Sequence, residues 1–365
     1  MKKQRDLSTS VGACLQAKSF GLRVNRFVRL QAGSYGLALA ALFGAGAAAA
    51  QQVETHTLQN EHLSYRFTPE IGGRGLGFSV AGGENLLKVG EAVRETPAPE
   101  VSAESGFVPY FGHIIWPGPQ GDWWKHQSLN AERRESAAVW PPDPFTVLAD
   151  SELETLGETE ATMVSPASPV TGLQLTKRYR LDGETLVHRV EAANRRDEPV
   201  QWDIWFNTRV SPEARLYVPV EDFDGDLRLE KFPEMSAEAQ VDPDKSELGL
   251  FDFSRGNHVK AKAYIEPAAG WIAAFDRGQL FLIEFDQQPR DSIHPEQGQV
   301  EVYLEQDPDK PGSGIMELEV HAPYRALTPG ESMAAEERWR ALAYTGEDNV
   351  EGHLRALEKL GLEGL

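Results

Sequence analysis

"TGLQLTKRYRLDGETLVHRVEAAN", Thr171 to Asn194, contains the clearest folding signal in the chain. Apolar and polar residues alternate on both sides of Asp182-Gly183, and Asp-Gly between two such runs is typical of a β-hairpin turn. Similar runs, rich in Val, Ile, Tyr, Phe and Trp and bounded by Gly, Pro, Asp or Asn, recur from Thr55 onward. A dozen or more such strands predict an all-β fold, a single large antiparallel sandwich.

Helical spacing of apolar residues is clear in the tail, from Glu347 to Leu365. Val350, Leu354 and Leu357 recur there at intervals of three or four residues. We therefore expect a short C-terminal helix that packs on a sheet as a closing element.

The N-terminus resembles an export signal. A basic region precedes an apolar run, Tyr35 to Ala50, whose last small residues fit a signal-peptidase cleavage rule. We expect residues 1–50 to be a signal peptide cleaved near Ala50, and 51–365 to form one periplasmic or secreted domain. A membrane anchor is the alternative, although the run is short and rich in Ala and Gly. The sole cysteine, Cys14, lies in the leader, which suits an oxidising compartment.

The mature chain is strongly acidic. Removal of seven basic residues and Asp6 leaves 29 basic and 55 acidic residues, a net charge of −26. Such a field repels nucleic acid and anionic membrane surfaces, so we expect neither as a partner. No phosphate-binding loop, dinucleotide fingerprint or zinc-protease motif is present, so we expect no cofactor and no metal. The oligomeric state stays open.

Charged residues alternate with apolar ones in "MELEVHAP", Met316 to Pro323. On a strand, Glu317, Glu319 and His321 point to one face, and the apolar residues between them point to the other. A carboxylate and an imidazole are a natural pair for proton transfer. The alternative is that the ionisable face is simply solvated.

Two Pro-rich segments, 106–127 and 139–145, hold four tryptophans. A flat indole can cover the C–H face of a sugar ring, so Trp116 and Trp140 are candidate platforms, although either could be core. Asp143 could accept sugar hydroxyls or merely cap a turn. The candidate imidazoles, which could instead be held in loops or turns, are His113, His126 and His294.

A third pattern, "WDIWFNTRV", runs from Trp202 to Val210. Asp203, Trp205 and Asn207 share one face, which Arg209 extends. Arginine in a sugar pocket would suit an acidic or phosphorylated sugar, and surface salt bridging is the alternative.

Three fragments, in order, resemble the galactose mutarotase-like superfamily: "IGGRGLGFSVAGGENLLKV", "EPVQWDIWFNTRV", and "VEVYLEQ" with "ELEVHAPYRALTPGES". The segments "GHIIWPGP" and "WPPDP" resemble a bacterial branch of it, domain of unknown function number 4380. The resemblance spans Thr55 to Leu342 and implies a β-supersandwich that binds carbohydrate. It implies Glu319 as catalytic base, with Glu317 in play because the register is uncertain, and His113 or His294 as acid. Asp203 stands where the epimerases of this fold carry their catalytic histidine, which is a departure.

These observations leave three hypotheses. The first is that the chain is an exported sugar epimerase or mutarotase that uses a carboxylate base and a histidine acid. The second is that it is a non-catalytic glycan-binding protein. The third is an accessory factor in envelope polysaccharide handling.

Overall fold

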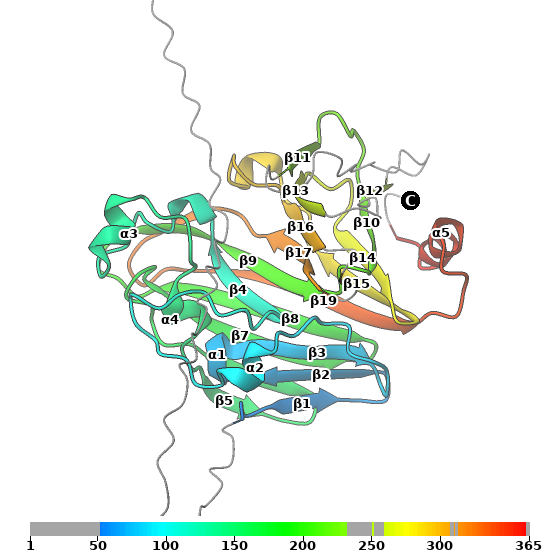
Figure 1. Ribbon diagram of the computed structural model, residues 1–365, viewed down its shortest axis with the longest axis horizontal. Helices are drawn as coiled ribbons and strands as arrows, with labels where there is room; N and C mark the ends of the chain where they lie inside the picture. Colours follow the sequence, from blue (N-terminus) through cyan, green and yellow to red (C-terminus); the bar gives the residue numbers. More distant parts are fainter. Residues whose placement is uncertain (1–51, 232–249, 252–258, 307–309, 311–312, 363–365) are drawn as a thin grey trace, which may run out of the picture. The chain divides into compact units, whose positions relative to one another are not determined.

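The computed structural model describes residues 52–231, 250–251, 259–306, 310 and 313–362, and the predicted signal peptide lies outside them. The chain from Gln52 onward forms one compact unit. Two antiparallel sheets dominate it, and short helices occupy the connections (Figure 1). The predicted all-β class is confirmed.

Sheet A contains most of the candidate site residues predicted from the sequence, on β4, β9 and β17. Figure 1 shows β9 between β4 and β17 in this sheet. Its spatial order is β1 (His56–Gln59), β2 (Leu63–Thr68), β3 (Arg74–Val80), β4 (His113–Gly118), β9 (Val200–Val210), β17 (Ile315–His321), β16 (Val300–Gln306), β13 (Val259–Ile265) and β11 (Leu227–Lys231), with β18 (Arg325–Leu327) paired to β9.

Sheet B contains the hairpin that the sequence predicts. Leu173 pairs with Asn194 and Asp182 with Thr185, so the turn falls at Gly183, which has a positive φ of 58°. The order of sheet B is β12 (Leu250–Phe251), β10 (Arg215–Pro219), β14 (Trp271–Asp276), β15 (Gln279–Phe285), β19 (Ser332–Ala343), β8 (Thr185–Asn194), β7 (Leu173–Asp182), β6 (Glu160–Val164) and β5 (Glu152–Leu156).

The two sheets pack face to face through large aromatic side chains. Phe78 of sheet A lies 5.2 Å from Phe281 and 5.4 Å from Trp339 of sheet B, between ring centroids. Phe206, Leu318 and other alternate residues of the central strands complete this core. Side chains at the intervening positions of β9 and β17 therefore project to the far face of sheet A.

The helices are short. They are α1 (Glu70–Gly73), α2 (Ala92–Glu95), η1 (Gln120–Asp122), α3 (Ala131–Glu135), α4 (Pro144–Val147), η2 (Arg290–Ser292) and α5 (Val350–Glu358). The predicted C-terminal helix is present as α5, whose His353 packs against Tyr217 and Phe275 of sheet B, in a core cluster that includes Leu357. It is shorter than the periodic segment because the chain adopts a positive φ of 64° at Gly361. Among the described residues, no helix has the length and apolar character needed to cross a membrane.

Candidate functional site

A group of polar and ionisable side chains gathers on the far face of sheet A. Cross-strand pairing sets Asn207 opposite Glu319, Glu319 opposite Glu301, and Glu301 opposite Tyr264. Alternation along each strand brings their same-face neighbours beside them. We call the following residues the polar cluster: Trp116 from β4, Asp203, Trp205, Asn207 and Arg209 from β9, Glu317, Glu319 and His321 from β17, Glu301 from β16, and Lys262 from β13.

The polar cluster is buried, so the alternative of a solvated strand face does not describe this molecule. Glu319 and His321 are 0% exposed, and Arg209 is 1% exposed. Part of the cover comes from the loop after η2, where the Gln297 side-chain amide lies 2.9 Å from His321 Nδ1. Burial of so many ionisable groups is costly unless their charges are paired.

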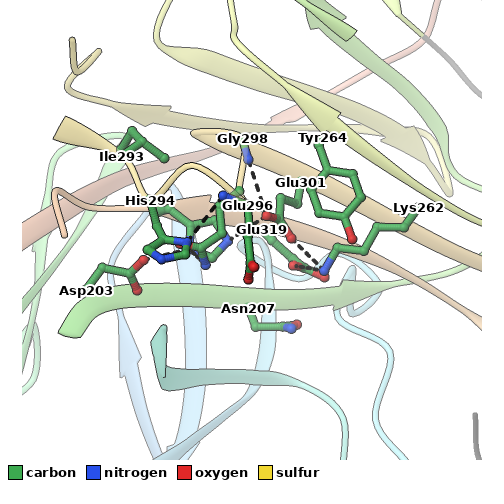
Figure 2. A network of polar contacts seen from close by, with 12 residues as sticks. Asp203, Asn207, Lys262, Tyr264, Ile293, His294, Glu296, Gly298, Glu301 and Glu319 are labelled. Carbon is green, nitrogen blue, oxygen red and sulfur yellow. Dashed lines mark hydrogen bonds and ion pairs between the residues drawn. The ribbon is translucent and has the colours of Figure 1, made fainter. Parts of the chain in front are cut away.

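Three cations pair with the carboxylates. Figure 2 shows the Lys262 ammonium at the carboxylates of Glu301 and Glu319, at distances of 2.6 and 3.0 Å. Arg209 Nε donates to Glu317 Oε1 at 2.8 Å. His321 completes the set, with Nδ1 at 3.2 Å from Asp203 Oδ2 and Nε2 at 3.5 Å from Glu301 Oε1.

The cluster contains one more carboxylate than it has cations. Asp203, Glu301, Glu317 and Glu319 face Arg209, Lys262 and a protonated His321. Burial raises the pKa of Glu319, and the neighbouring Glu317 and Glu301 raise it further, while Lys262 opposes the shift. Glu319 therefore holds the extra proton most readily.

His321 is the cationic partner of this arrangement. Burial alone lowers the pKa of an imidazole, but the carboxylates of Glu301 and Asp203 outweigh it and raise the pKa of His321 to about 9. The ring is thus a proton donor at neutral pH. It packs against Trp205, with 4.9 Å between ring centroids.

Several buried polar atoms of the cluster have no hydrogen-bond partner among the described residues. They include donors and acceptors: Trp116 Nε1, Trp205 Nε1, Arg209 Nη1 and Nη2, Asp203 Oδ1, Asn207 Oδ1 and Glu319 Oε1. Leaving such an atom unsatisfied costs about 1–3 kcal/mol. This concentration favours a polar ligand or ordered water at the cluster.

Tryptophans line one side of the cluster. Trp116 lies edge-on to Trp205, Trp123 and Trp140, with ring centroids 4.9, 5.6 and 6.2 Å apart. The Arg209 guanidinium sits 4.7 Å from the centroid of the Trp116 ring. An aromatic wall and a set of hydrogen-bonding groups therefore adjoin one another.

The structure separates three predicted residues, His113, Asp143 and His126, from this cluster. His113 points into the core between the sheets, where its Nδ1 lies 2.9 Å from Thr208 Oγ1, so it does not meet Glu319. The Asp143 carboxylate caps α4 and accepts hydrogen bonds from Phe145, Thr146, Ser168 and Thr171.

His126, the third of these, packs against Trp202, with 5.4 Å between ring centroids. His294 is half-buried in the loop after η2, beside Tyr324, and Figure 2 draws it with the polar contacts of the cluster. The remaining predicted residues meet in or beside the cluster: Glu317, Glu319, His321, Asp203, Trp205, Asn207, Arg209, Trp116 and, at its edge, Trp140.

Sequence analysis missed Glu301, Lys262 and Gln297. Glu301 and Lys262 carry the same signal as Glu319, because each is an ionisable residue that alternates with apolar residues in a strand. Gln297 lies in a loop and carries no comparable pattern.

The cluster can bind hydroxyl groups and move protons. Glu301, Glu319 and His321 also offer ligand atoms within 4.8 Å of one another, a spacing compatible with a metal ion. The Lys262 ammonium already supplies a cation to both carboxylates. The chemistry that these residues support best is therefore acid–base catalysis or polar recognition without metal at this position.

Replacing Lys262 by Met tests the charge balance of the cluster. We expect a loss of about 3–5 kcal/mol in the free energy of unfolding, because a buried carboxylate loses its cation. Glu301→Gln in the same chain restores most of the loss, since it removes the uncompensated charge. Urea unfolding of both variants measures this, with Arg180→Met as control because Arg180 pairs with Asp182 where both side chains are more than half exposed. Equal stability of wild type and Lys262→Met would contradict the account.

The raised pKa of His321 predicts how stability depends on pH. The folded chain holds this proton after the unfolded chain has released it. The contribution of His321 to the free energy of unfolding is therefore full below pH 6.5 and is lost as pH rises through about 9. We expect a fall of roughly 1.4 kcal/mol per pH unit from this group in that window. Chemical unfolding across it should show a shallower fall in His321→Gln, but not in the surface control His62→Gln. A wild-type curve that is flat or rises would rule this out.

Comparisons with known proteins agree with the fold. The chain is similar to a candidate aldose 1-epimerase from Escherichia coli K12 (15% identity, TM-score 0.52), covering 80% of this chain and 99% of that one. It is also similar to a galactose mutarotase-like protein from Lactobacillus casei (10% identity, TM-score 0.52), covering 79% of this chain and 100% of that one. A third similar structure is a candidate aldose 1-epimerase from Klebsiella pneumoniae (12% identity, TM-score 0.53), covering 84% of this chain and 83% of that one. At these identities the likeness shows the fold alone. Among curated proteins, none matches.

The resemblance inferred from the sequence motifs is confirmed at the level of fold and family. The model of the family described as Domain of unknown function (DUF4380) matches residues 53–342. The chain belongs to the DUF4380 family and has a galactose mutarotase-like fold.

Proposed function

We propose that the polar cluster binds a carbohydrate and interconverts its anomers by proton transfer. The observation that carries this proposal is the set of buried, unpartnered donors and acceptors beside the tryptophan wall. A sugar offers hydroxyl groups that both donate and accept hydrogen bonds, and a C–H face that packs on indole rings. The fold, which the chain shares with mutarotase-like proteins, supports the same reading.

Glu319 and His321 are the proposed catalytic pair. They lie on the same face of β17, and Glu301 contacts His321 and shares Lys262 with Glu319. Only the ionised form of Glu319 can act as the base, and a pKa of about 8 makes it the minor form at neutral pH. That form takes the proton of the anomeric hydroxyl while the bond between C1 and the ring oxygen breaks. His321 gives its proton to the ring oxygen, and the reverse steps on the other face of C1 close the ring as the other anomer.

The sequence-based prediction gave His113 or His294 as the acid, whereas we propose His321. His113 lies on the opposite face of sheet A, whereas His321 contacts Asp203, which stands where epimerases of this fold are expected to carry their histidine. An imidazole therefore reaches that position from the neighbouring strand.

Arg209 suggests which sugars bind best. Its Nε is paired with Glu317, and its Nη1 and Nη2 have no hydrogen-bond partner among the described residues. Two adjacent guanidinium donors match the two oxygens of a carboxylate. We expect uronic acids to bind more tightly than the corresponding neutral sugars.

A second candidate function is glycan binding without turnover. The observation that favours it is the raised pKa of Glu319, because a carboxyl group that is mostly protonated at neutral pH is a poor general base. This candidate predicts sugar affinity with no acceleration of anomer exchange.

Glu319→Gln and His321→Gln separate the two candidates. If the pair is catalytic, each variant should lower the rate of anomer exchange about 10²–10⁴-fold while sugar affinity changes little. Proton NMR exchange spectroscopy of the anomeric signals measures the rate, and calorimetry with neutral and uronic sugars measures affinity. Glu305→Gln on β16 is the matched control. The Glu305 side chain is half-exposed, and its ion pair with Lys260 is long, at 3.9 Å.

Trp140→Ala tests the tryptophan wall independently of catalysis. We expect it to weaken binding by about 1 kcal/mol. Wild type that binds sugar but does not speed exchange would support the second candidate. Wild type that binds neither neutral nor uronic sugars would remove both.

We also propose that the chain is exported and processed near Ala50. The support is the basic and apolar order of residues 1–50, which lie outside the described residues. Expression in a Gram-negative host followed by intact-mass measurement should show a periplasmic protein that begins near Gln51. A full-length cytoplasmic product would contradict this.

A further inference from the structure

A second buried group of ionisable side chains lies between the two sheets, away from the polar cluster. His113 comes from β4 of sheet A, and His188 and Glu337 are directly opposite each other on β8 and β19 of sheet B. The two histidines are 1% exposed and Glu337 is 0% exposed. We call these three residues, which face one another between sheet A and sheet B, the core triad.

The spacing of the core triad is that of metal ligands. Each residue offers one ligand atom, and the three atoms lie within 4.8 Å of one another. Yet His113 Nε2, both His188 nitrogens and Glu337 Oε1 have no hydrogen-bond partner among the described residues. Ligands about 2.0–2.2 Å from a tetrahedral metal lie about 3.3–3.6 Å apart, so small side-chain movements would complete the site.

Neighbouring residues hold two of the three ligands in the right orientation. His113 Nδ1 lies 2.9 Å from Thr208 Oγ1, which leaves Nε2 to face the triad. Trp339 Nε1 donates to Glu337 Oε2 at 2.8 Å, which leaves Oε1. Hydrogen bonds of this kind to the far side of metal-bound His and carboxylate ligands are typical of metal sites.

The triad offers two neutral imidazoles and one buried carboxyl group as ligands. Burial lowers the pKa of both histidines, so their ring nitrogens carry lone pairs, and burial raises the pKa of Glu337 to about 8. The positive charge of Lys177 also lowers the pKa of both histidines, and Arg209 and Arg74 lower the pKa of His113. These cations oppose a bound metal ion, so the Glu337 carboxylate would have to offset them. The Lys177 ammonium is turned to the carbonyls of Gly72 and Gly73, so it does not occupy the triad as Lys262 occupies the polar cluster.

We propose that His113, His188 and Glu337 bind one divalent transition-metal ion between the two sheets. Two imidazoles and one carboxylate are a donor set that suits Zn²⁺ or Fe²⁺, with the fourth position open to water. Such an ion would link β4 of sheet A to β8 and β19 of sheet B. It is contrary to our expectation from sequence, because these ligands are spread over 225 residues and form no local motif.

The test is Zn²⁺ binding to protein first treated with a chelator. We expect one Zn²⁺ per chain by calorimetry and a rise in Tm, because metal that binds only the folded chain stabilises it. Co²⁺ in the same site should give visible absorption bands of a low-coordinate ion. Glu337→Gln should weaken Zn²⁺ binding by more than about 100-fold, since even outer partners of ligands are worth about 10–100-fold. Glu301→Gln in the polar cluster is the matched control and should leave it unchanged.

Several results would overturn the proposal. They are no Zn²⁺ or Co²⁺ binding by wild type, unchanged affinity in Glu337→Gln, and loss of affinity in Glu301→Gln. If Glu337→Gln does not fold, X-ray absorption of Zn²⁺-loaded wild type decides instead. Two imidazole ligands per zinc support the triad, and any other number contradicts it. Sugar binding is not needed for either readout, so this test is independent of the proposed function.

Discussion

The ion pairs of Lys262 with Glu301 and Glu319 allow the far face of sheet A to be buried. Each buried carboxylate would cost several kcal/mol without a cation, and one ammonium contacts two of them at 2.6 and 3.0 Å. Arg209 and His321 compensate the others. With three cations for four carboxylates, the face retains one extra proton, which Glu319 holds most readily. That proton makes the face suited to acid–base chemistry.

The central strands of sheet A are buried on both sides, and each side has a distinct chemistry. β4 contributes Trp116 to the polar cluster and His113 to the core triad, and the two residues point to opposite faces because an odd number of positions separates them. The polar cluster has its own internal cation, whereas the core triad has unpartnered ligand atoms. One strand therefore serves a proposed sugar site and a proposed metal site.

Local patterns predicted the fold well and the site in part. Asp182-Gly183 fixed the hairpin, and the alternation from Met316 to Val320 placed Glu319 and His321 on one face. The same period-two rule places His113 and Trp116 on opposite faces of β4, so the two cannot share one site. For Asp143 the turn-capping alternative describes the structure, because its carboxylate caps α4 through Phe145 and Thr146. Only its further partners, Ser168 and Thr171, are distant in sequence. Glu301 and Lys262 join the cluster through long-range strand pairing, which no local pattern determines.

The central claim is that the polar cluster is where a sugar binds. A crystal structure of the protein soaked with a uronic acid tests it most directly. The account predicts sugar density bounded by Trp116 and Arg209, with hydroxyl oxygens within hydrogen-bond distance of Glu319 and Asn207. Density for water alone at these groups, or sugar bound only elsewhere on the chain, would contradict it.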